Sequence, residues 1–532
     1  MSTIAAPAAL ATAGAGLARW RVLVGAVIVQ LILGTVYGYS IFWQPLQAEV
    51  FPKILTRAEA SQIIQAGGSA AGFTIVADDA ARKVQQDVQQ GHLKYAFSLC
   101  ILSFAVVMVL AGRVQDAKGP RFTALIGAAL MGGGFLTAGL MSSPAVFYLA
   151  HAAFVGAVGL VLLTLFDAFF GRLGARRSPA ARHAPLAIMS AVTVAGIALA
   201  NSYVGRSGEI DRLFLLWGTV GFLAGAGIGF AYVCPIAALA KWFPNAKGLV
   251  LGIAVAGFGF GAYLFSSKDL PFGATSFIES HGITRFFIVH GLVCLAAVSA
   301  GALMLSNPPS TPARAPQEAE WQEMLRRPAF YLLWPMFFSG ALAGLTVIGI
   351  LKDFAGEQLV AMQPGGGAGL DEAARRALML QGAAAVGLLS IFNAVGRIGW
   401  GLLSDRVGRT TAFVAMFLLQ AATMFLLPGM RTEAMLGVAA CLVGFNFGGC
   451  FALFPSATAD LFGAKNLGAN YGLVFTAYGI AGVVGVAAGN TARVLTGSYT
   501  AAFALAGALC LLSAGMALVL GALQKREARA AA

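Results

Sequence analysis

One basic residue lies where a charge is costly. Arg397 occurs about two helical turns inside the apolar run Ile391–Arg409, which reads I-F-N-A-V-G-R-I-G-W-G-L-L-S-D-R-V-G-R. If this run crosses a membrane, an unpaired guanidinium at that depth costs several kcal/mol or more. Arginine keeps its proton and presents a planar fork that matches a carboxylate. We therefore expect Arg397 to bind a small carboxylate anion. The alternatives are a structural ion pair or a side chain that reaches the membrane surface.

Two short basic loops repeat one pattern. One reads G-R-V-Q-D-A-K-G-P-R at 112–121 and the other G-L-L-S-D-R-V-G-R-T at 401–410, and in both an Asp follows the first Gly by four residues. The candidate gating residues of these loops are Arg113, Asp116, Arg121, Asp405, Arg406 and Arg409. We expect each Asp to accept hydrogen bonds from the N-terminus of the following helix and to pair with a neighbouring Arg, which would latch two bundles on the cytoplasmic side. Anchoring of helix ends by positive charge explains the Arg residues but not the repeated Asp and Gly.

Further polar residues could line a cavity near the buried arginine. Asn393 lies one helical turn earlier on the same face and could support it as a donor. Tyr37 and Tyr232 could offer hydroxyls to a carboxylate and ring faces to its tail, although aromatic residues in membrane spans also serve as packing. Lys352 and Asp353 could form an outer gate or a proton site, or could simply anchor a helix end at the membrane surface.

The composition is that of a membrane protein. Of the 532 residues, 58% are hydrophobic and 11% are charged, and the mean hydropathy is +0.80. A soluble protein carries about 25% charged residues. A net charge of +13 could indicate nucleic acid, but most basic residues fall between hydrophobic runs, where they orient membrane spans. The six cysteines lie in apolar stretches without ligand spacing. We expect a protein embedded in the lipid bilayer, with no nucleic-acid partner, metal or cofactor.

Fourteen hydrophobic runs are long enough to cross a bilayer, which takes about 20 residues. They lie near 20–45, 93–112, 121–142, 145–168, 185–205, 213–238, 247–268, 285–306, 329–351, 379–402, 411–428, 434–457, 469–488 and 500–522. With the N-terminus inside, the short inner loops hold the tight clusters of Lys and Arg. Both termini are therefore predicted to be cytoplasmic, in a multi-pass protein of the cell inner (plasma) membrane.

A second repeat follows the basic loops. W-F-P-N-A-K-G at 242–248 and L-F-G-A-K-N-L-G at 461–468 each precede a Gly-rich helix. Repeats in the same order on both sides of a Pro-rich linker predict two homologous halves, as in transporters. About 126 residues separate the two motifs in the first half and about 56 in the second, and the difference of about 70 is the size of a helical hairpin with its turns. We expect an all-α polytopic membrane protein of two six-helix bundles plus an inserted two-helix hairpin, 14 transmembrane helices in total.

The predicted spans and the spacing of the repeats also determine the expected domain bounds. They are a cytoplasmic N-terminus at 1–19, an N-terminal bundle at 20–306 with an external cap at 46–91 and the hairpin at 144–212, a cytoplasmic linker at 307–328, a C-terminal bundle at 329–522 and a cytoplasmic tail at 523–532. The cap is predicted to contain helical pieces at Arg57–Gln65 and Asp78–Gln90, and Asp353–Leu378 is expected to be an outer loop. We expect a monomer.

The motifs resemble those of a known family. The paired loops are similar to the signature of the major facilitator superfamily. The segments L-G-T-V-Y-G-Y-S (33–40), W-F-P-N-A-K-G-L-V-L-G-I-A-V-A-G-F-G (242–259), F-N-A-V-G-R-I-G-W-G-L-L-S-D-R (392–406) and F-A-L-F-P-S-A-T-A-D-L-F-G-A-K-N-L-G-A-N-Y-G-L-V-F-T-A-Y-G (451–479) look like its oxalate:formate antiporter family. The resemblance implies the fold of that superfamily and makes Arg397 the counterpart of a substrate-binding arginine. It also implies a second cation, a lysine, where this chain has Tyr478, one turn after Phe475. One arginine with a phenol suits a monocarboxylate such as lactate or formate better than oxalate.

These observations predict a secondary transporter of small organic anions that works by alternating access, as an antiporter or a symporter. A fourteen-helix drug:proton antiporter of the same superfamily is the alternative within this class, but such a protein typically uses a membrane-embedded acidic residue. A membrane enzyme would need a nucleophile with a base or a metal cluster, and a sensor would need a sizeable soluble output domain. The sequence offers neither pattern, so no enzyme activity is expected.

Overall fold

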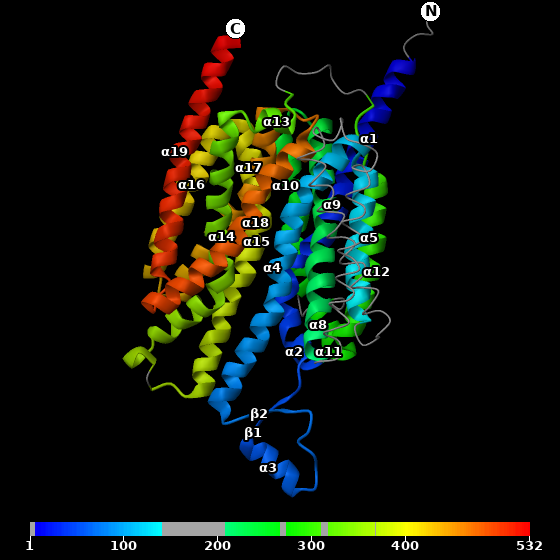
Figure 1. The fold of residues 1–532 in the computed structure, drawn as a ribbon. Coiled ribbons are helices and arrows are strands. Elements are labelled where there is room, and N and C mark those ends of the chain that lie inside the picture. Colours follow the sequence, from blue (N-terminus) through cyan, green and yellow to red (C-terminus); the bar gives the residue numbers. More distant parts are fainter. Residues whose placement is uncertain (1–5, 141–207, 267–272, 310–317, 368, 532) are drawn as a thin grey trace, which may run out of the picture.

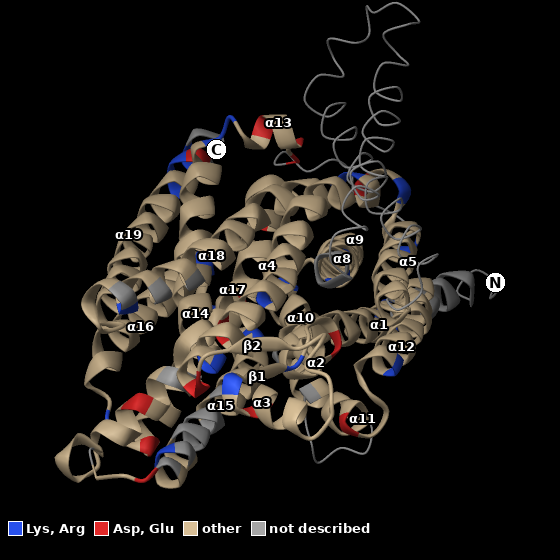
Figure 2. Cartoon of the chain, turned by 60° about the horizontal axis from the view of Figure 1, so that its bottom comes forward, with Lys and Arg blue, Asp and Glu red and all other residues tan. Residues whose placement is uncertain are grey.

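The computed structural model describes residues 6–140, 208–266, 273–309, 318–367 and 369–531. Long helices run from one end of the molecule to the other (Figure 1). Within these ranges, eleven helices are long and apolar enough to cross a membrane. The charged residues lie mainly toward the ends of the helices (Figure 2). The predicted hairpin at 144–212 falls almost wholly outside the described residues, so the expected total of fourteen spans stays a prediction.

The first group of helices surrounds α9. Its members are α1 (Ala6–Leu33), the 3-10 segment η1 (Gly34–Phe42), α4 (Asp79–Lys118), α5 (Pro120–Gly139), α8 (Gly208–Leu216), the π-helical segment η2 (Trp217–Leu223), α9 (Ala224–Trp242), α10 (Lys247–Ser266) and α12 (Ile283–Met304). Helix α9 packs against α1, α4 and α5, and α12 covers α1 and α5. The shorter helices α2 (Trp43–Val50) and α11 (Ala274–His281) lie toward the end of the molecule where the cap is found (Figure 1).

The second group repeats this arrangement. Its members are α14 (Pro328–Ala361), α15 (Glu372–Val407), α16 (Arg409–Leu426), α17 (Glu433–Phe462), α18 (Leu467–Thr496) and α19 (Thr500–Ala531), with short 3-10 turns at Pro364–Gly367 and Leu427–Gly429. Helix α15 packs on α17, α14 on α18, and α16 on α19. The two groups meet where α10 crosses α15 and where α4 crosses α18. The expected domain bounds are not tested by these contacts and remain predictions.

The cap contains a small sheet that the sequence pattern did not reveal. Strand β1 (Ile54–Thr56) pairs in parallel with β2 (Thr74–Val76), and α3 (Arg57–Gln65) follows β1. The all-helical expectation is wrong here, because three-residue strands are too short to show an alternating pattern. Helix α3 begins with a capping box between Thr56 and Glu59. The hydrogen bond from the Thr56 backbone N–H, together with nearby Arg82, lowers the pKa of the Glu59 carboxyl.

Two predicted boundaries also need correction. The expected helical piece at 78–90 is not separate but forms the first turns of α4, which starts with Asp78 accepting a hydrogen bond from the Ala81 N–H. The expected outer loop at 353–378 is shorter, because α14 continues to Ala361 and α15 begins at Glu372. Three consecutive glycines with positive φ, Gly365 to Gly367, make the turn between them. The side chains of Lys352 and Asp353 lie outside the described residues, so their predicted roles remain untested.

Glycines allow the helices of the first group to approach closely. A Cβ added to Gly127 of α5 would lie 2.6 Å from the backbone oxygen of Gly227 and 2.7 Å from the backbone nitrogen of Ala231, both in α9. Gly133, on the same helix, has open space around its position. Replacing each of these two glycines of α5 by alanine therefore distinguishes the effect of helix packing from that of helix propensity.

We expect Gly127→Ala to destabilise the protein by about 1–3 kcal/mol, because the added methyl group meets backbone that cannot move aside easily. The measurement is thermal unfolding of the purified protein in detergent. Gly133→Ala is the matched control and should leave the melting temperature unchanged or slightly higher. Equal melting temperatures for the two variants would contradict close packing of α5 on α9.

Candidate functional site

Arg397 is fully buried between the two groups of helices, with 0% of its surface exposed. Its Nε donates to Asn393 Oδ1 at 3.0 Å, and its Nη1 donates to the backbone oxygen of Val255 at 2.7 Å. Within the described chain it forms no ion pair, and Nη2 has no hydrogen-bond partner. Backbone and amide oxygens therefore hold the guanidinium in place without cancelling its charge.

The surrounding helices explain this position. Asn393 lies one turn before Arg397 on α15, and it accepts a hydrogen bond from the guanidinium rather than donating one as predicted. Helix α10 can supply a backbone oxygen because it passes very close to α15. A Cβ added to Gly252 would lie only 2.3 Å from the backbone oxygen of Arg397. The first group thus contributes the Val255 carbonyl, and the second group contributes the cation.

Aromatic rings enclose the guanidinium. Its central carbon lies 4.4 Å from the ring centre of Phe451 on α17 and 5.5 Å from that of Phe258 on α10. Ring faces carry partial negative charge and stabilise a nearby cation. Phe475 continues this wall, with its ring centre 6.3 Å from that of Phe451 and 5.3 Å from that of Tyr232. The structure therefore places the predicted Phe475 and Tyr232 beside Arg397. Neither Phe451 nor Phe258 was predicted from the sequence.

Tyr37 and Tyr478 bridge the two groups of helices. Their hydroxyl oxygens are 2.8 Å apart and share a hydrogen bond. The Tyr478 ring lies 4.9 Å from Phe475, and the Arg397 charge is close enough to act on both hydroxyls. The two phenols thus belong to the same site, but each already has a partner in the other.

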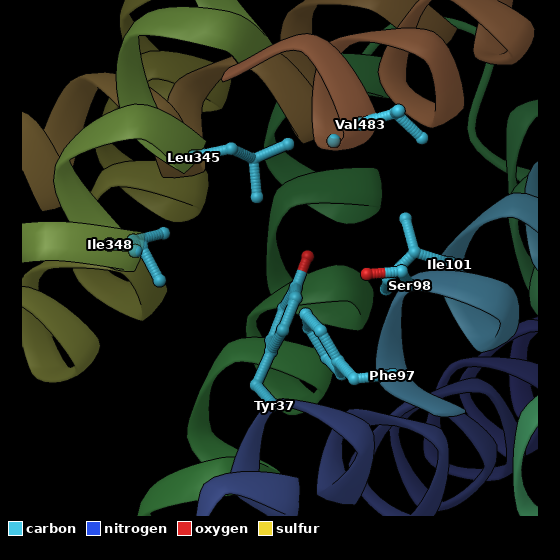
Figure 3. A pocket seen from close by; sticks show the side chains of 9 residues that line it. Tyr37, Phe97, Ser98, Ile101, Leu345, Ile348 and Val483 are labelled. Carbon is cyan, nitrogen blue, oxygen red and sulfur yellow. The ribbon is translucent and has the colours of Figure 1, made fainter. Parts of the chain in front are cut away.

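A pocket opens next to Tyr37 (Figure 3). It is lined by Tyr37, Phe97, Ser98, Ile101, Leu345, Ile348, Gly349, Gly482 and Val483. Ser98 precedes Asp116 by 18 residues on α4, about 27 Å of helix, so the pocket lies on the side of the site that faces the cap. Its lining is mainly apolar, with the hydroxyls of Ser98 and Tyr37 as exceptions.

The two Asp residues of the repeated loops bind helix N-termini of the opposite group. Asp405 accepts from the backbone N–H groups of Gly248 and Leu249 at 3.0 and 2.8 Å, at the start of α10. Asp116 accepts from those of Gly468 and Ala469 at 3.2 and 2.8 Å, at the start of α18. The prediction that each Asp binds the helix that follows it is therefore wrong. Each carboxylate satisfies free N–H groups at the positive end of a helix in the other half. We call these two contacts the Asp405 latch and the Asp116 latch.

The Asp405 latch includes the predicted pair of an Asp with a neighbouring Arg and two ion pairs to Asp460 that were not predicted. Arg409 contacts Asp405 at 2.8 Å and Asp460 of α17 at 2.8 Å. Lys247 of α10 also contacts Asp460, at 2.8 Å, across the interface. Asp116 has no ion pair among the described residues, although the Lys241 charge acts on it.

The other three candidate gating residues lie outside the two latches. Arg121 and Arg406 are exposed, and the described residues give neither a salt-bridge partner. Arg113 stacks on Trp321 at 5.6 Å, so it contacts the linker rather than a latch. Of the six candidates, the structure therefore brings only Asp116, Asp405 and Arg409 into the latches.

The chain around the linker is bound at residues 306 and 319 by side chains close to the N-termini of the two latched helices. Trp242, before α10, donates from Nε1 to the Ser306 oxygen at 2.7 Å. Asn466 and Asn470, at the start of α18, donate to the Ala319 oxygen at 3.2 and 3.0 Å. The short helix α13 (Trp321–Met324) follows this contact. The linker therefore connects the two latches as well as the two groups of helices.

Comparisons with known proteins agree with this architecture. A family model described as Major Facilitator Superfamily matches residues 150–486 and 377–531. An uncharacterized MFS-type transporter of Escherichia coli (strain K12), YhjX, is 24% identical over 474 residues, which cover 87% of this chain and 86% of that protein. The oxalate:formate antiporter of Oxalobacter formigenes is 30% identical over 342 residues, 60% of this chain and 74% of that one. Among solved structures, FucP in its outward conformation gives a TM-score of 0.53 at 15% identity, covering 93% of this chain and 98% of that chain.

The Asp405 latch can be tested through Leu251, which lies on α10 between Gly248 and Gly252, two of the glycines that touch α15. Asp405→Asn removes the charge that attracts both Arg409 and the N-terminus of α10. We expect it to raise the rate at which a cysteine introduced at Leu251 reacts with a permeant maleimide about fivefold, the effect of roughly 1 kcal/mol. Arg406→Gln is the control, since Arg406 is exposed, and should change nothing. Equal rates in all three proteins would show that Asp405 does not hold the helices together.

Proposed function

Because the chain belongs to the major facilitator superfamily, a family of membrane transporters rather than enzymes, we propose that it moves small organic anions by alternating access. The chain is a multi-pass membrane protein, and its relatives include an oxalate:formate antiporter. The proposed substrates are monocarboxylates such as lactate or formate, in preference to oxalate. Exchange and proton symport are both compatible with this proposal.

The buried charge of Arg397 is the observation that carries the proposal. A guanidinium keeps its proton inside a protein, and its burial without an acidic partner is costly. A bound carboxylate would supply the missing negative charge and fill the free Nη2 position. Because Arg397 lies on α15 and its backbone partner Val255 lies on α10, an anion bound there would contact both groups of helices. Binding would thereby favour a closed arrangement of the two.

The preference for a single negative charge rests on the residues around Arg397. Tyr478 stands where the resemblance to the antiporter family implies a second cation, and its hydroxyl bonds to Tyr37. The described groups that contact the Arg397 guanidinium are aromatic rings, a side-chain amide and a backbone carbonyl. A dianion would keep an unbalanced negative charge in this environment, which is unfavourable in a medium of low dielectric constant.

The two ends of the molecule support the proposal of alternating access. Both latches lie at the end opposite the cap (Figure 1), and the pocket beside Tyr37 (Figure 3) lies on the cap side of the site. We assign a gating role to Asp116, Asp405 and Arg409, extended by Asp460 and Lys247. The latched end is assigned to the cytoplasm of a cell with the protein in its inner membrane, in keeping with the basic loops there.

A drug:proton antiporter of the same superfamily is the rival proposal. Such a transporter would bind an organic cation and would need a carboxylate in the membrane interior. The described surroundings of Arg397 present a cation instead, which favours an anionic substrate. The two proposals differ in the charge of the molecule that is transported, so one uptake experiment separates them.

Counterflow in proteoliposomes tests the proposal with labelled lactate, formate, pyruvate and oxalate, with and without a pH gradient. We expect lactate or formate to be the best competitor and Arg397→Gln to lower uptake at least about 30-fold, because truncating one partner of a buried charge pair costs about 2–5 kcal/mol or more. Arg406→Gln is the matched control for loss of an arginine and should behave as wild type. Oxalate as the best competitor would overturn the monocarboxylate preference. Carboxylate uptake that is unchanged in Arg397→Gln would overturn the transport site itself.

A further inference from the structure

Two tyrosine hydroxyls near Arg397 have no hydrogen-bond partner. They belong to Tyr232 on α9 and Tyr471 on α18, both with 0% exposed surface. Together with Arg397 Nη2 they make three polar groups that are buried and unsatisfied in one region. The Arg397 charge acts on both hydroxyls, and the two hydroxyls also interact with each other. Buried polar groups are nearly always satisfied in folded proteins, so a cluster of three exceptions needs an explanation.

The chemistry of these groups fits one kind of ligand. Guanidinium N–H groups and phenol O–H groups are donors, and an ionised carboxylate is an acceptor with two oxygens and about four lone-pair directions. One carboxylate can therefore accept from Arg397 Nη2 and from both phenols. Only the guanidinium carries charge, so a single carboxylate also neutralises the site. Neither Tyr37 nor Tyr478 is free in this way, because their hydroxyls bond to each other.

The position of Tyr471 connects this cluster to the Asp116 latch. Tyr471 is the fifth residue of α18 and follows Ala469, one of the two residues whose N–H groups bind Asp116, by two positions. Its ring packs 5.6 Å from Phe475, which continues the aromatic wall to Phe451 and Arg397. Tyr232 belongs to the first group of helices, so the three donors come from both sides of the interface.

We infer that Tyr471, with Tyr232 and the free Nη2 of Arg397, forms the subsite for the substrate carboxylate. This inference rests on the proposed function and adds Tyr471 as a binding residue. The Tyr37–Tyr478 pair then lies at the other end of the site, next to the pocket. The carboxylate points toward the latches, and the remainder of the substrate lies against the rings of Phe258, Phe451 and Phe475. An anion held by Tyr471 contacts the helix turn that Asp116 holds.

The test is Tyr471→Phe, which removes the hydroxyl and keeps the ring packing. We expect the KM for labelled lactate and for formate to rise about tenfold or more, the effect of one hydrogen bond to a charged group. Tyr39→Phe is the matched control. Tyr39 is equally buried with an unpartnered hydroxyl, but its ring packs on Phe42, Phe97 and Phe135 in the first group. The KM of the Tyr39→Phe variant should equal that of the wild type.

A second measurement makes the result independent of transport rate. Lactate should raise the melting temperature of purified wild-type protein and of Tyr39→Phe, but much less that of Tyr471→Phe. In a Tyr232→Phe, Tyr471→Phe double variant, the fold-increase in KM should be smaller than the product of the two single fold-increases, because both hydroxyls bind one carboxylate. If Tyr471→Phe matches wild type in KM and in the lactate-induced shift while Arg397→Gln loses uptake, the subsite is overturned and the proposed function stands. If Arg397→Gln also keeps its uptake, both are overturned.

Discussion

The charge of Arg397 constrains everything around it. A guanidinium cannot escape the membrane interior by losing its proton, so the protein must stabilise it by other means. In the described structure the means are a carbonyl, an amide oxygen and two ring faces. Each is a partial negative charge, and none is a carboxylate. The close crossing of α10 and α15, with glycine at the contact, is what brings the carbonyl within reach. The close packing of α10 on α15 and the stabilisation of the Arg397 charge therefore depend on the same contact.

The sequence predicted the parts of this arrangement that leave a local signal. A basic residue inside an apolar run is visible without a structure, and so are a repeated Gly and Asp spacing and a hydrophobic run long enough to span a bilayer. The family assignment, which motif resemblance suggested, is confirmed by the match to the superfamily. The predicted neighbours Tyr232, Asn393, Phe475 and Tyr478 do lie beside Arg397, although their part in binding remains a proposal.

The parts that the sequence could not predict depend on which helices meet. The contact made by the Val255 carbonyl has no signature in the sequence, because every residue has a backbone carbonyl. The partners of Asp116 and Asp405 lie 353 and 157 residues away at their farthest, and only the packing of the two groups reveals them. Tyr471 has no distinguishing signal in the sequence, because aromatic residues are common in membrane helices. What distinguishes it is a hydroxyl without a partner, which is a property of the fold alone.

The two latches are related by the repeat but differ in composition. Moving α10 away from α15 must break the ion pair of Lys247 with Asp460 as well as the backbone hydrogen bonds to Asp405, whereas the described contacts of Asp116 with α18 are hydrogen bonds to backbone. Ion pairs near a surface weaken as salt increases, and backbone hydrogen bonds respond far less. The Asp405 latch therefore contains an ion pair across the interface that depends on salt, and the described contacts of the Asp116 latch contain none. A two-fold repeat in sequence thus gives two contacts that respond unequally to ionic strength.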